Sequence, residues 1–155
     1  MPEDLWDEVL TVNLKSMMLA SKYAIPEIIK TGGGAIINLS SIGGLRAGKN
    51  SRVSYNTSKG GVIALTSTMA AQHGRDNVRV NCIAPGAIDT PMASNAVESP
   101  GVRSTPLGTL GTAWDVAWAA VYLASDEARW VTGIVLPVDA GSLVTSPAVA
   151  SLYWE

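Results

Sequence analysis

The sequence has little charge, a single cysteine and no apolar run that approaches the roughly 18 residues needed to cross a bilayer. Charged residues make up 15% of the chain and the formal net charge is −2, which argues against nucleic acid or an anionic membrane as a partner. The lone Cys82 cannot close an internal disulfide, which suits a reducing compartment. The acidic start MPEDLWDEV lacks the basic and apolar regions of a secretory signal. We therefore expect a cytoplasmic protein with neither nucleic-acid nor membrane partners.

The chain does contain enough hydrophobic residues to form a core. Hydrophobic residues form 47% of the 155 positions, and a chain of this length buries about 70% of its unfolded surface as one domain. Helical and strand patterns alternate, and the strand patterns are near-continuous apolar runs, as in parallel sheets covered on both faces. We predict an α/β fold, one domain over residues 1–155, with helices at 4–30, 53–74 and after Thr112, and strands at 35–41, 78–85 and 133–139.

Two segments lack these patterns. Residues 92–111 are rich in Ser, Pro and Gly and are predicted to form a substrate loop, and residues 143–155 a C-terminal tail. Thr112 and Asp115 have the spacing of a capping box that opens the third helix. Polar residues gather where the strands end, and ligands of parallel sheets bind beyond these carboxyl ends. We expect the functional site there.

The segment VSYNTSKGG contains a tyrosine, Tyr55, four residues before a lysine, Lys59. Four residues return almost to the same face of a helix, so both side chains can reach one point. An ammonium beside a phenol favours its deprotonated form, which makes a proton donor and acceptor usable near neutral pH. An ordinary surface pair on an amphipathic helix is the alternative, and the pair alone does not exclude it.

Asn13 interrupts the apolar stripe of the first predicted helix, between Leu10 and Met17. An amide on a buried helical face is costly unless it has hydrogen-bond partners, so we expect other polar groups opposite Asn13. A different helix phase, or a capping role in a neighbouring turn, would also explain the position.

Taken together, the segments TVNLKS, GGGAIINLSSIGG, YNTSK and RVNCIAPGAIDTPM, in this order, closely resemble the short-chain dehydrogenase/reductase family, and VTGIVLPVDAG is similar to its last strand. The resemblance implies a partial Rossmann-like, doubly wound parallel sheet of about three strands with flanking helices. It assigns the general acid/base to Tyr55, and it gives Lys59 the roles of promoting ionisation of this tyrosine and holding the nicotinamide ribose. It also assigns the substrate-positioning serine to Ser41, with Ser40 as a rival, and a water-anchoring amide to Asn13.

The resemblance also implies a cofactor, NAD or NADP, whose nicotinamide end would contact Tyr55, Lys59, Pro85, Gly86, Ile88 and Thr90. It covers residues 4–142 and corresponds to the C-terminal half of the family. The N-terminal βαβ half, with the glycine-rich turn that receives the pyrophosphate and the residue that selects NAD or NADP, has no counterpart. The strand at 35–41 would then have an open edge, and cofactor affinity would be low. No metal ligands are assigned.

Three functions follow as hypotheses. The first is an NAD(P)-dependent oxidoreductase that acts on an alcohol or carbonyl compound. The second is a non-catalytic interaction module that forms homo-oligomers through the helices at 4–30 and 53–74. The third is a hydrolase that uses Ser41, which lacks the Gly-x-Ser-x-Gly turn of such enzymes. Trp114 and Trp118, four residues apart, are interpreted as core or interface residues.

Overall fold

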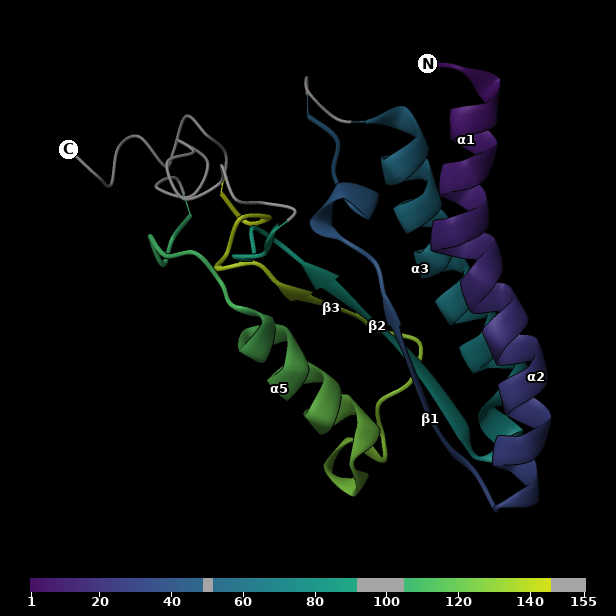
Figure 1. The fold of residues 1–155 in the computed structure, drawn as a ribbon. Coiled ribbons are helices and arrows are strands. Elements are labelled where there is room, and N and C mark those ends of the chain that lie inside the picture. The colour runs from purple at the N-terminus through teal and green to yellow at the C-terminus, as the bar shows by residue number, and fades with distance from the viewer. Residues whose placement is uncertain (49–51, 92–104, 146–155) are drawn as a thin grey trace.

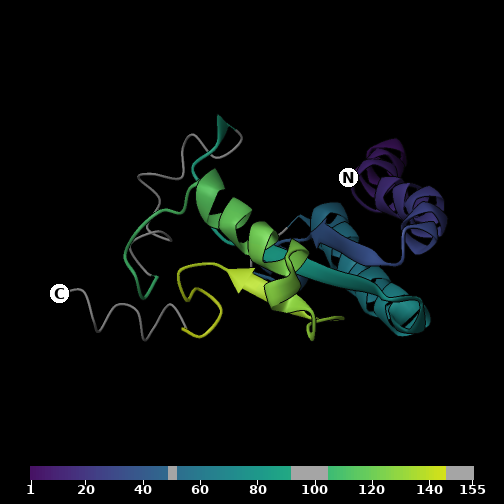
Figure 2. The ribbon, with the colours of Figure 1, turned by 90° about the horizontal axis from the view of Figure 1, so that it is seen from below.

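The computed structural model describes residues 1–48, 52–91 and 105–145. A parallel sheet of three strands, in the order β1-β2-β3, lies between two helical layers. Helices α1, α2 and α3 are on one side of the sheet and α5 is on the other (Figures 1 and 2). The predicted α/β architecture with about three parallel strands is confirmed. Most of the predicted substrate loop, residues 92–104, and residues 146–155 of the predicted tail lie outside the described residues.

The first predicted helix is present over almost its full expected length, but it is interrupted. Helix α1 (Glu3–Leu10) leads into a π-helical segment, η1 (Thr11–Lys15), and α2 (Ser16–Lys30) follows without a break. The period of apolar residues did not predict this segment. Such π segments often occur at functional sites. Asn13 is the central residue of η1.

The other elements agree with the sequence within a few residues. Strand β2 (Val78–Pro85) has the predicted bounds, β1 (Gly34–Leu39) ends two residues early, and β3 (Val135–Val138) is shorter at both ends. Helix α3 (Val53–His73) gives way to a 3₁₀ turn, η3 (Gly74–Asp76), and η5 (Asp126–Ala128) follows α5 (Ala113–Ala124). The predicted capping box is present at the start of α5: the Thr112 amide and hydroxyl donate to Asp115 Oδ2 over 2.6 and 2.8 Å. None of the described helices is both long and apolar enough to span a membrane.

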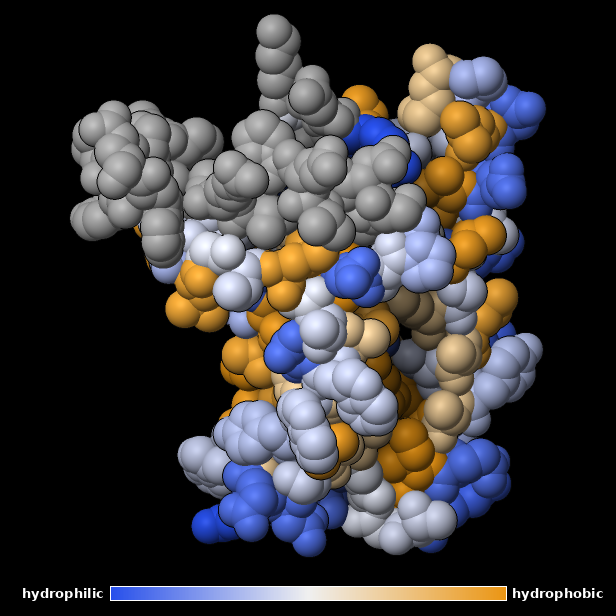
Figure 3. Space-filling model, turned by 60° about the vertical axis from the view of Figure 1, so that its left-hand side comes forward, coloured by the Kyte–Doolittle hydropathy of each residue, from blue (hydrophilic) through white to orange (hydrophobic). Residues whose placement is uncertain are grey.

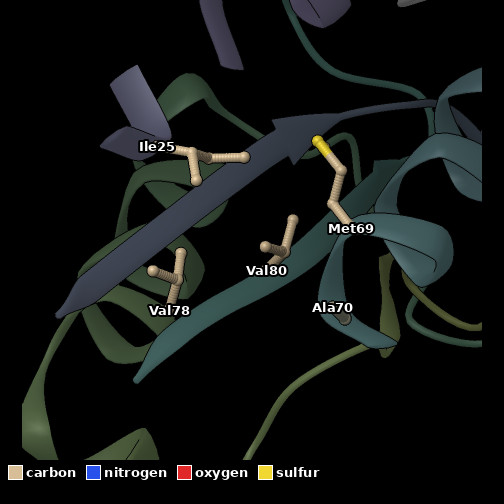
Figure 4. Packing of buried hydrophobic residues seen from close by; sticks show 5 residues of the cluster. All are labelled: Ile25, Met69, Ala70, Val78 and Val80. Atoms are coloured by element: carbon tan, nitrogen blue, oxygen red, sulfur yellow. The ribbon is translucent and has the colours of Figure 1, made fainter. Parts of the chain in front are cut away.

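The core lies between the sheet and helices α2 and α3. Ile25 of α2 and Met69 of α3 meet Val78 and Val80 of β2 there, with Ala70 beside them (Figure 4). Because successive residues of a strand face opposite sides, Ile83 of β2 is on the other face, toward α5, and it is also fully buried. Strand β2 is therefore the buried centre of the sheet.

Strand β1 has a free edge. Within the described residues it pairs only with β2, from Gly34↔Val78 to Leu39↔Ile83. Leu39 at its end is 44% exposed. Figure 3 turns α5 toward the viewer and shows apolar surface uncovered across the middle of this face. An unpaired edge can add a further strand from another segment or chain.

Truncation of a core valine in β2 should destabilise the fold. Val80→Ala removes two methyl groups from a site with 0% exposure, and we expect a loss of about 2 kcal/mol in the free energy of unfolding. Val144→Ala makes the same change at a position that is 85% exposed and should have little effect. Urea denaturation of both variants measures the difference. Equal effects at the two positions would contradict the assigned core.

Cys82 should be protected from thiol reagents in the folded protein. The residue is fully buried, and burial raises the pKa of its thiol, so that the reactive thiolate is scarce. A colorimetric thiol reagent at about pH 8, near the pKa of a free cysteine, should label the folded chain far more slowly than the chain in denaturant. Labelling at the same rate in both states would place Cys82 outside the core.

Candidate active site

A cavity of about 750 Å³ lies at the carboxyl ends of β1 and β2, where the sequence predicts the site. Strand ends, the loop after β2, the start of α3 and one side of α5 form its walls. Its lining residues are Ile37, Leu39, Ser40, Ser41, Arg52, Tyr55, Pro85, Gly86, Ala87, Ile88, Thr90, Ala113, Val116, Ala117 and Ala120. Six of the eight residues assigned to catalysis or cofactor binding from the sequence are in this set. Lys59 and Asn13 lie beside it.

The first turns of α3 carry Tyr55 and Lys59 on one face. The Lys59 ammonium is 5.7 Å from the centroid of the Tyr55 ring. Lys59 Nζ also donates a hydrogen bond of 3.0 Å to the Leu39 carbonyl at the end of β1. Burial lowers the pKa of the Lys59 ammonium, and the smaller electrostatic effect of Cys82 acts in the opposite direction. The helix therefore holds a cation beside a phenol at the end of the sheet.

The loop after β1 crosses α3 at this point because of a glycine. A Cβ atom on Gly44 would lie 2.7 Å from the Lys59 backbone carbon, so a larger residue would push the loop off the helix. Ser41 caps the 3₁₀ turn η2 (Ile42–Gly44) and accepts a hydrogen bond of 3.0 Å from the Gly43 amide. This close approach puts the serines at the same cavity as Tyr55.

The two candidate serines differ in what their hydroxyls do. Ser40 is 5% exposed, and its hydroxyl donates a 2.7 Å hydrogen bond to the Lys59 carbonyl. The Ser41 hydroxyl accepts from Gly43, so its own hydrogen stays available to a ligand in the cavity. Ser40 is thus engaged in joining β1 to α3, whereas Ser41 retains a donor.

Asn13 has the polar partner that its place in an apolar stripe predicts. Its Nδ2 donates a 3.1 Å hydrogen bond to the Ser58 hydroxyl, which in turn donates over 2.7 Å to the Tyr55 carbonyl. The chain of contacts joins the π-helical segment to the first turn of α3. Asn13 and Tyr55 also share a smaller neighbouring cavity of about 370 Å³. Capping of a neighbouring turn is not the role of Asn13, since its amide reaches across to α3.

The loop after β2 supplies the remaining predicted contacts. The Gly86 amide donates a 2.9 Å hydrogen bond to the Val138 carbonyl of β3, which fixes the turn. Ile88 then forms an isolated bridge to Gly111. Pro85, Gly86, Ile88 and Thr90 all line the cavity that contains Tyr55.

These residues fit one end of a nicotinamide dinucleotide. A flat ring could lie between the Pro85–Thr90 loop and Tyr55, where backbone amides, the Thr90 hydroxyl and the Lys59 ammonium can donate hydrogen bonds. Within the described ranges, no comparable group of hydrogen-bond donors is present for the pyrophosphate of such a cofactor. Gly32 and Gly33 precede β1 and Gly34 begins it, at the opposite end of the sheet, whereas Gly43 and Gly44 after β1 belong to the turn η2. The described residues could therefore hold the nicotinamide end of the cofactor but not its pyrophosphate.

Arg52 and the wall formed by α5 were not predicted from the sequence. The Arg52 guanidinium carbon is 5.3 Å from the centroid of the Tyr55 ring, and Arg52 lines both cavities. Its position three residues before Tyr55, close to one helical turn, was the available signal. On α5, Ala113, Ala117 and Ala120 recur at helical spacing and face the cavity, which only the packing of the helix reveals.

Comparisons with known proteins agree with the fold and the motifs. A family model described as enoyl-(acyl carrier protein) reductase matches residues 1–142. The 3-oxoacyl-[acyl-carrier-protein] reductase FabG of Chlamydia muridarum is 40% identical over 144 residues, which are 91% of this chain and 58% of that protein. The 7alpha-hydroxysteroid dehydrogenase of Bacteroides fragilis is 40% identical over 151 residues, covering 94% of this chain and 58% of the relative.

Solved structures give the same result. One described as a short-chain dehydrogenase/reductase from Burkholderia xenovorans superposes with a TM-score of 0.89 at 36% identity, over 94% of this chain and 57% of that one. A 4-hydroxyisoleucine dehydrogenase mutant, complexed with NADH and succinate, gives 0.87 at 31% identity, over 94% of this chain and 62% of that one. The chain thus spans somewhat more than half the length of these relatives. It belongs to the short-chain dehydrogenase/reductase family.

Proposed function

We propose that this chain carries the catalytic groups of an NAD(P)-dependent oxidoreductase that interconverts an alcohol and a carbonyl compound. The observation that carries the proposal is the shared cavity. Ser41 and Tyr55 line it together with the Pro85–Thr90 loop, and the Lys59 ammonium lies 5.7 Å from the Tyr55 ring. Two relatives that are 40% identical to this chain are named as a reductase and a dehydrogenase.

The bound nicotinamide cofactor, NAD or NADP, would supply or accept the hydride. In the reducing direction the carbonyl oxygen gains negative charge, which needs hydrogen-bond donors and finally a proton. The Ser41 hydroxyl donates a hydrogen bond to this oxygen, and the Tyr55 hydroxyl transfers the proton to it. In the oxidising direction Tyr55 removes the proton of the alcohol, and the positive charge of Lys59 stabilises the phenolate that remains.

The other assigned residues support these steps. Lys59 would also donate to the ribose of the bound cofactor, while Pro85, Gly86, Ile88 and Thr90 would hold its nicotinamide end. Asn13 anchors a water through which the proton of Tyr55 is replaced, and the Asn13–Ser58 hydrogen bond fixes the orientation of its amide. We place the protein in the cytoplasm, as its single buried cysteine suggests.

Removal of the Tyr55 hydroxyl should abolish most of the activity. We expect Tyr55→Phe to lower kcat/KM by about 100-fold or more, the usual effect of losing a general acid/base. Absorbance of NADH and NADPH with a panel of carbonyl compounds measures the rate. Tyr23→Phe on the outer face of α2, where the side chain is 68% exposed, is the matched control and should react at the wild-type rate. Full activity of Tyr55→Phe would refute the assignment.

Substitution of the two serines should have different effects, one on kcat and the other on stability. Ser41→Ala removes the free donor and should lower kcat by about 10- to 1,000-fold, as in other sites that stabilise a developing oxyanion. Loss of its cap on η2 should lower the free energy of unfolding by no more than about 1 kcal/mol, so the fall in kcat is its distinguishing effect. Ser40→Ala removes the hydroxyl that joins the end of β1 to the Lys59 carbonyl, and we expect it to cost about 1 kcal/mol of stability with little change in kcat. The reverse pattern would make Ser40 the substrate serine.

The second candidate function is an interaction module. Apolar side chains of α1, η1 and α2 are exposed, among them Leu5, Val12 and Tyr23 at 45, 61 and 68%. The small residues of α3 do not all serve a partner, because a Cβ atom on Gly61 would meet Leu14 of this chain at 2.7 Å. Trp114 and Trp118 of α5 are 72 and 67% exposed, so the core interpretation of these residues is wrong and the interface interpretation stays a prediction.

Two measurements decide between the candidates. Calorimetric titration with NADH and NADPH tests the oxidoreductase, and saturable binding of either cofactor supports it. Light scattering of the same sample tests self-association through α1, α2 and α3. A chain that binds no cofactor but forms a defined oligomer would be an interaction module, whereas a folded monomer without cofactor binding would contradict both.

A further inference from the structure

One charged residue lines the main cavity, and the Lys59 ammonium lies beside it. Arg52 is the one arginine, lysine, aspartate or glutamate of the lining, and the other residues are apolar or small, carry hydroxyls, or are Tyr55. The walls on α5 and β1 are aliphatic, formed by Val116, Ala117, Ala120, Ile37 and Leu39. Acidic residues are absent from this set, so no fixed carboxylate in the cavity neutralises the guanidinium.

Arg52 lies next to the proposed reacting group. It is the residue before α3, in extended conformation (φ −87°, ψ 117°), and makes no capping contact. Its guanidinium carbon lies over the Tyr55 ring, 5.3 Å from the centroid. Within the described parts of the chain, no ion pair or side-chain hydrogen bond engages it. The amino end of the 21-residue helix α3 adds a partial positive charge at the same place.

We infer that Arg52 is a specificity-determining residue that binds an anionic group of the substrate. The inference rests on the proposed function. A guanidinium presents a planar fork of donors that matches the paired oxygens of a carboxylate or phosphate. Because Arg52 and Tyr55 line the same cavity, such an anion would lie a few bonds from the carbon that exchanges hydride. The substrate class is therefore an oxo acid or hydroxy acid, or a phosphate ester of similar size, with an aliphatic body against α5.

The phosphates of the cofactor are the other source of an anion. Geometry favours the substrate, because the Arg52 guanidinium lies over the ring that is proposed to transfer the proton, whereas the Pro85–Thr90 loop forms a separate wall of the cavity for the nicotinamide. The two sources make different predictions for Arg52→Gln. Loss of a substrate contact changes the preference between charged and neutral substrates, and loss of a phosphate contact weakens NADH and NADPH binding.

Steady-state kinetics with a matched pair of substrates tests the inference. Levulinate and its methyl ester have the same reacting ketone and differ by one negative charge. For the wild type we expect kcat/KM to favour levulinate by about tenfold or more, the scale of one charge-assisted hydrogen bond. In Arg52→Gln the ratio of acid to ester should fall by about tenfold, and Arg52→Lys should retain part of it because the charge remains.

Arg75→Gln is the matched control. It removes the same charge from an exposed position beyond the far end of α3, and the acid-to-ester ratio should stay at the wild-type value. A wild type that prefers the ester, or an Arg52→Gln variant with an unchanged ratio, would overturn the inference while the oxidoreductase stands. Weaker NADH binding in Arg52→Gln at an unchanged ratio would assign the residue to the cofactor instead.

A binding experiment separates failure of the inference from failure of the proposed function. Hexanoate and methyl hexanoate are titrated into the isotope-labelled chain, and amide shifts at the cavity are followed by NMR. We expect saturable shifts with hexanoate that are lost in Arg52→Gln and kept in Arg75→Gln. If neither cofactor supports turnover but this pattern holds, the anion site stands and the oxidoreductase fails. Equal binding of both compounds, or of hexanoate to both variants, would exclude the anion site.

Discussion

The packing of α3 across the β1–β2 pair is the constraint on which the rest of the structure depends. Val62, Met69 and Ala70 of α3 are buried against the sheet, and the Thr66 hydroxyl accepts a 2.9 Å hydrogen bond from the Asn38 amide of β1. The same helix carries Tyr55 and Lys59 in its first two turns. Burial of its later turns therefore fixes the reacting groups at the ends of the strands, and a tilt of α3 would move core and site together.

The site is assembled from short-range links across this frame. Lys59 donates to the end of β1, the Ser40 hydroxyl donates back to the Lys59 carbonyl, and Asn13 reaches α3 through Ser58. Each link joins two elements whose positions the core already determines. Polar groups with fixed partners cannot rotate freely, so donors without a fixed partner, among them those of Ser41 and Arg52, are available to a ligand.

Much of the fold could be predicted because patterns of neighbouring residues determine its helices and strands. The run at 78–85 is rich in β-branched residues and stopped by Pro85 and Gly86, which predicts a strand, and the strand has those bounds. The Thr112–Asp115 spacing predicts its cap because both residues lie within one turn. The interruption at Thr11–Lys15 could not be predicted, since an extra residue in one turn is stabilised by contacts with α3 and not by local preference. The exposure of Trp114 and Trp118 likewise depends on how α5 is rotated against the sheet.

The sequence by itself determined the order of helices and strands and the spacing of Tyr55 and Lys59, because helical geometry converts a separation of four residues into proximity. Only the tertiary structure decided which serine keeps a free hydroxyl, what Asn13 binds and that Arg52 is the one charged residue among those that line the cavity. These properties arise between residues that are remote in the chain. Their geometry is fixed when the helices pack on the sheet, and no local pattern contains it.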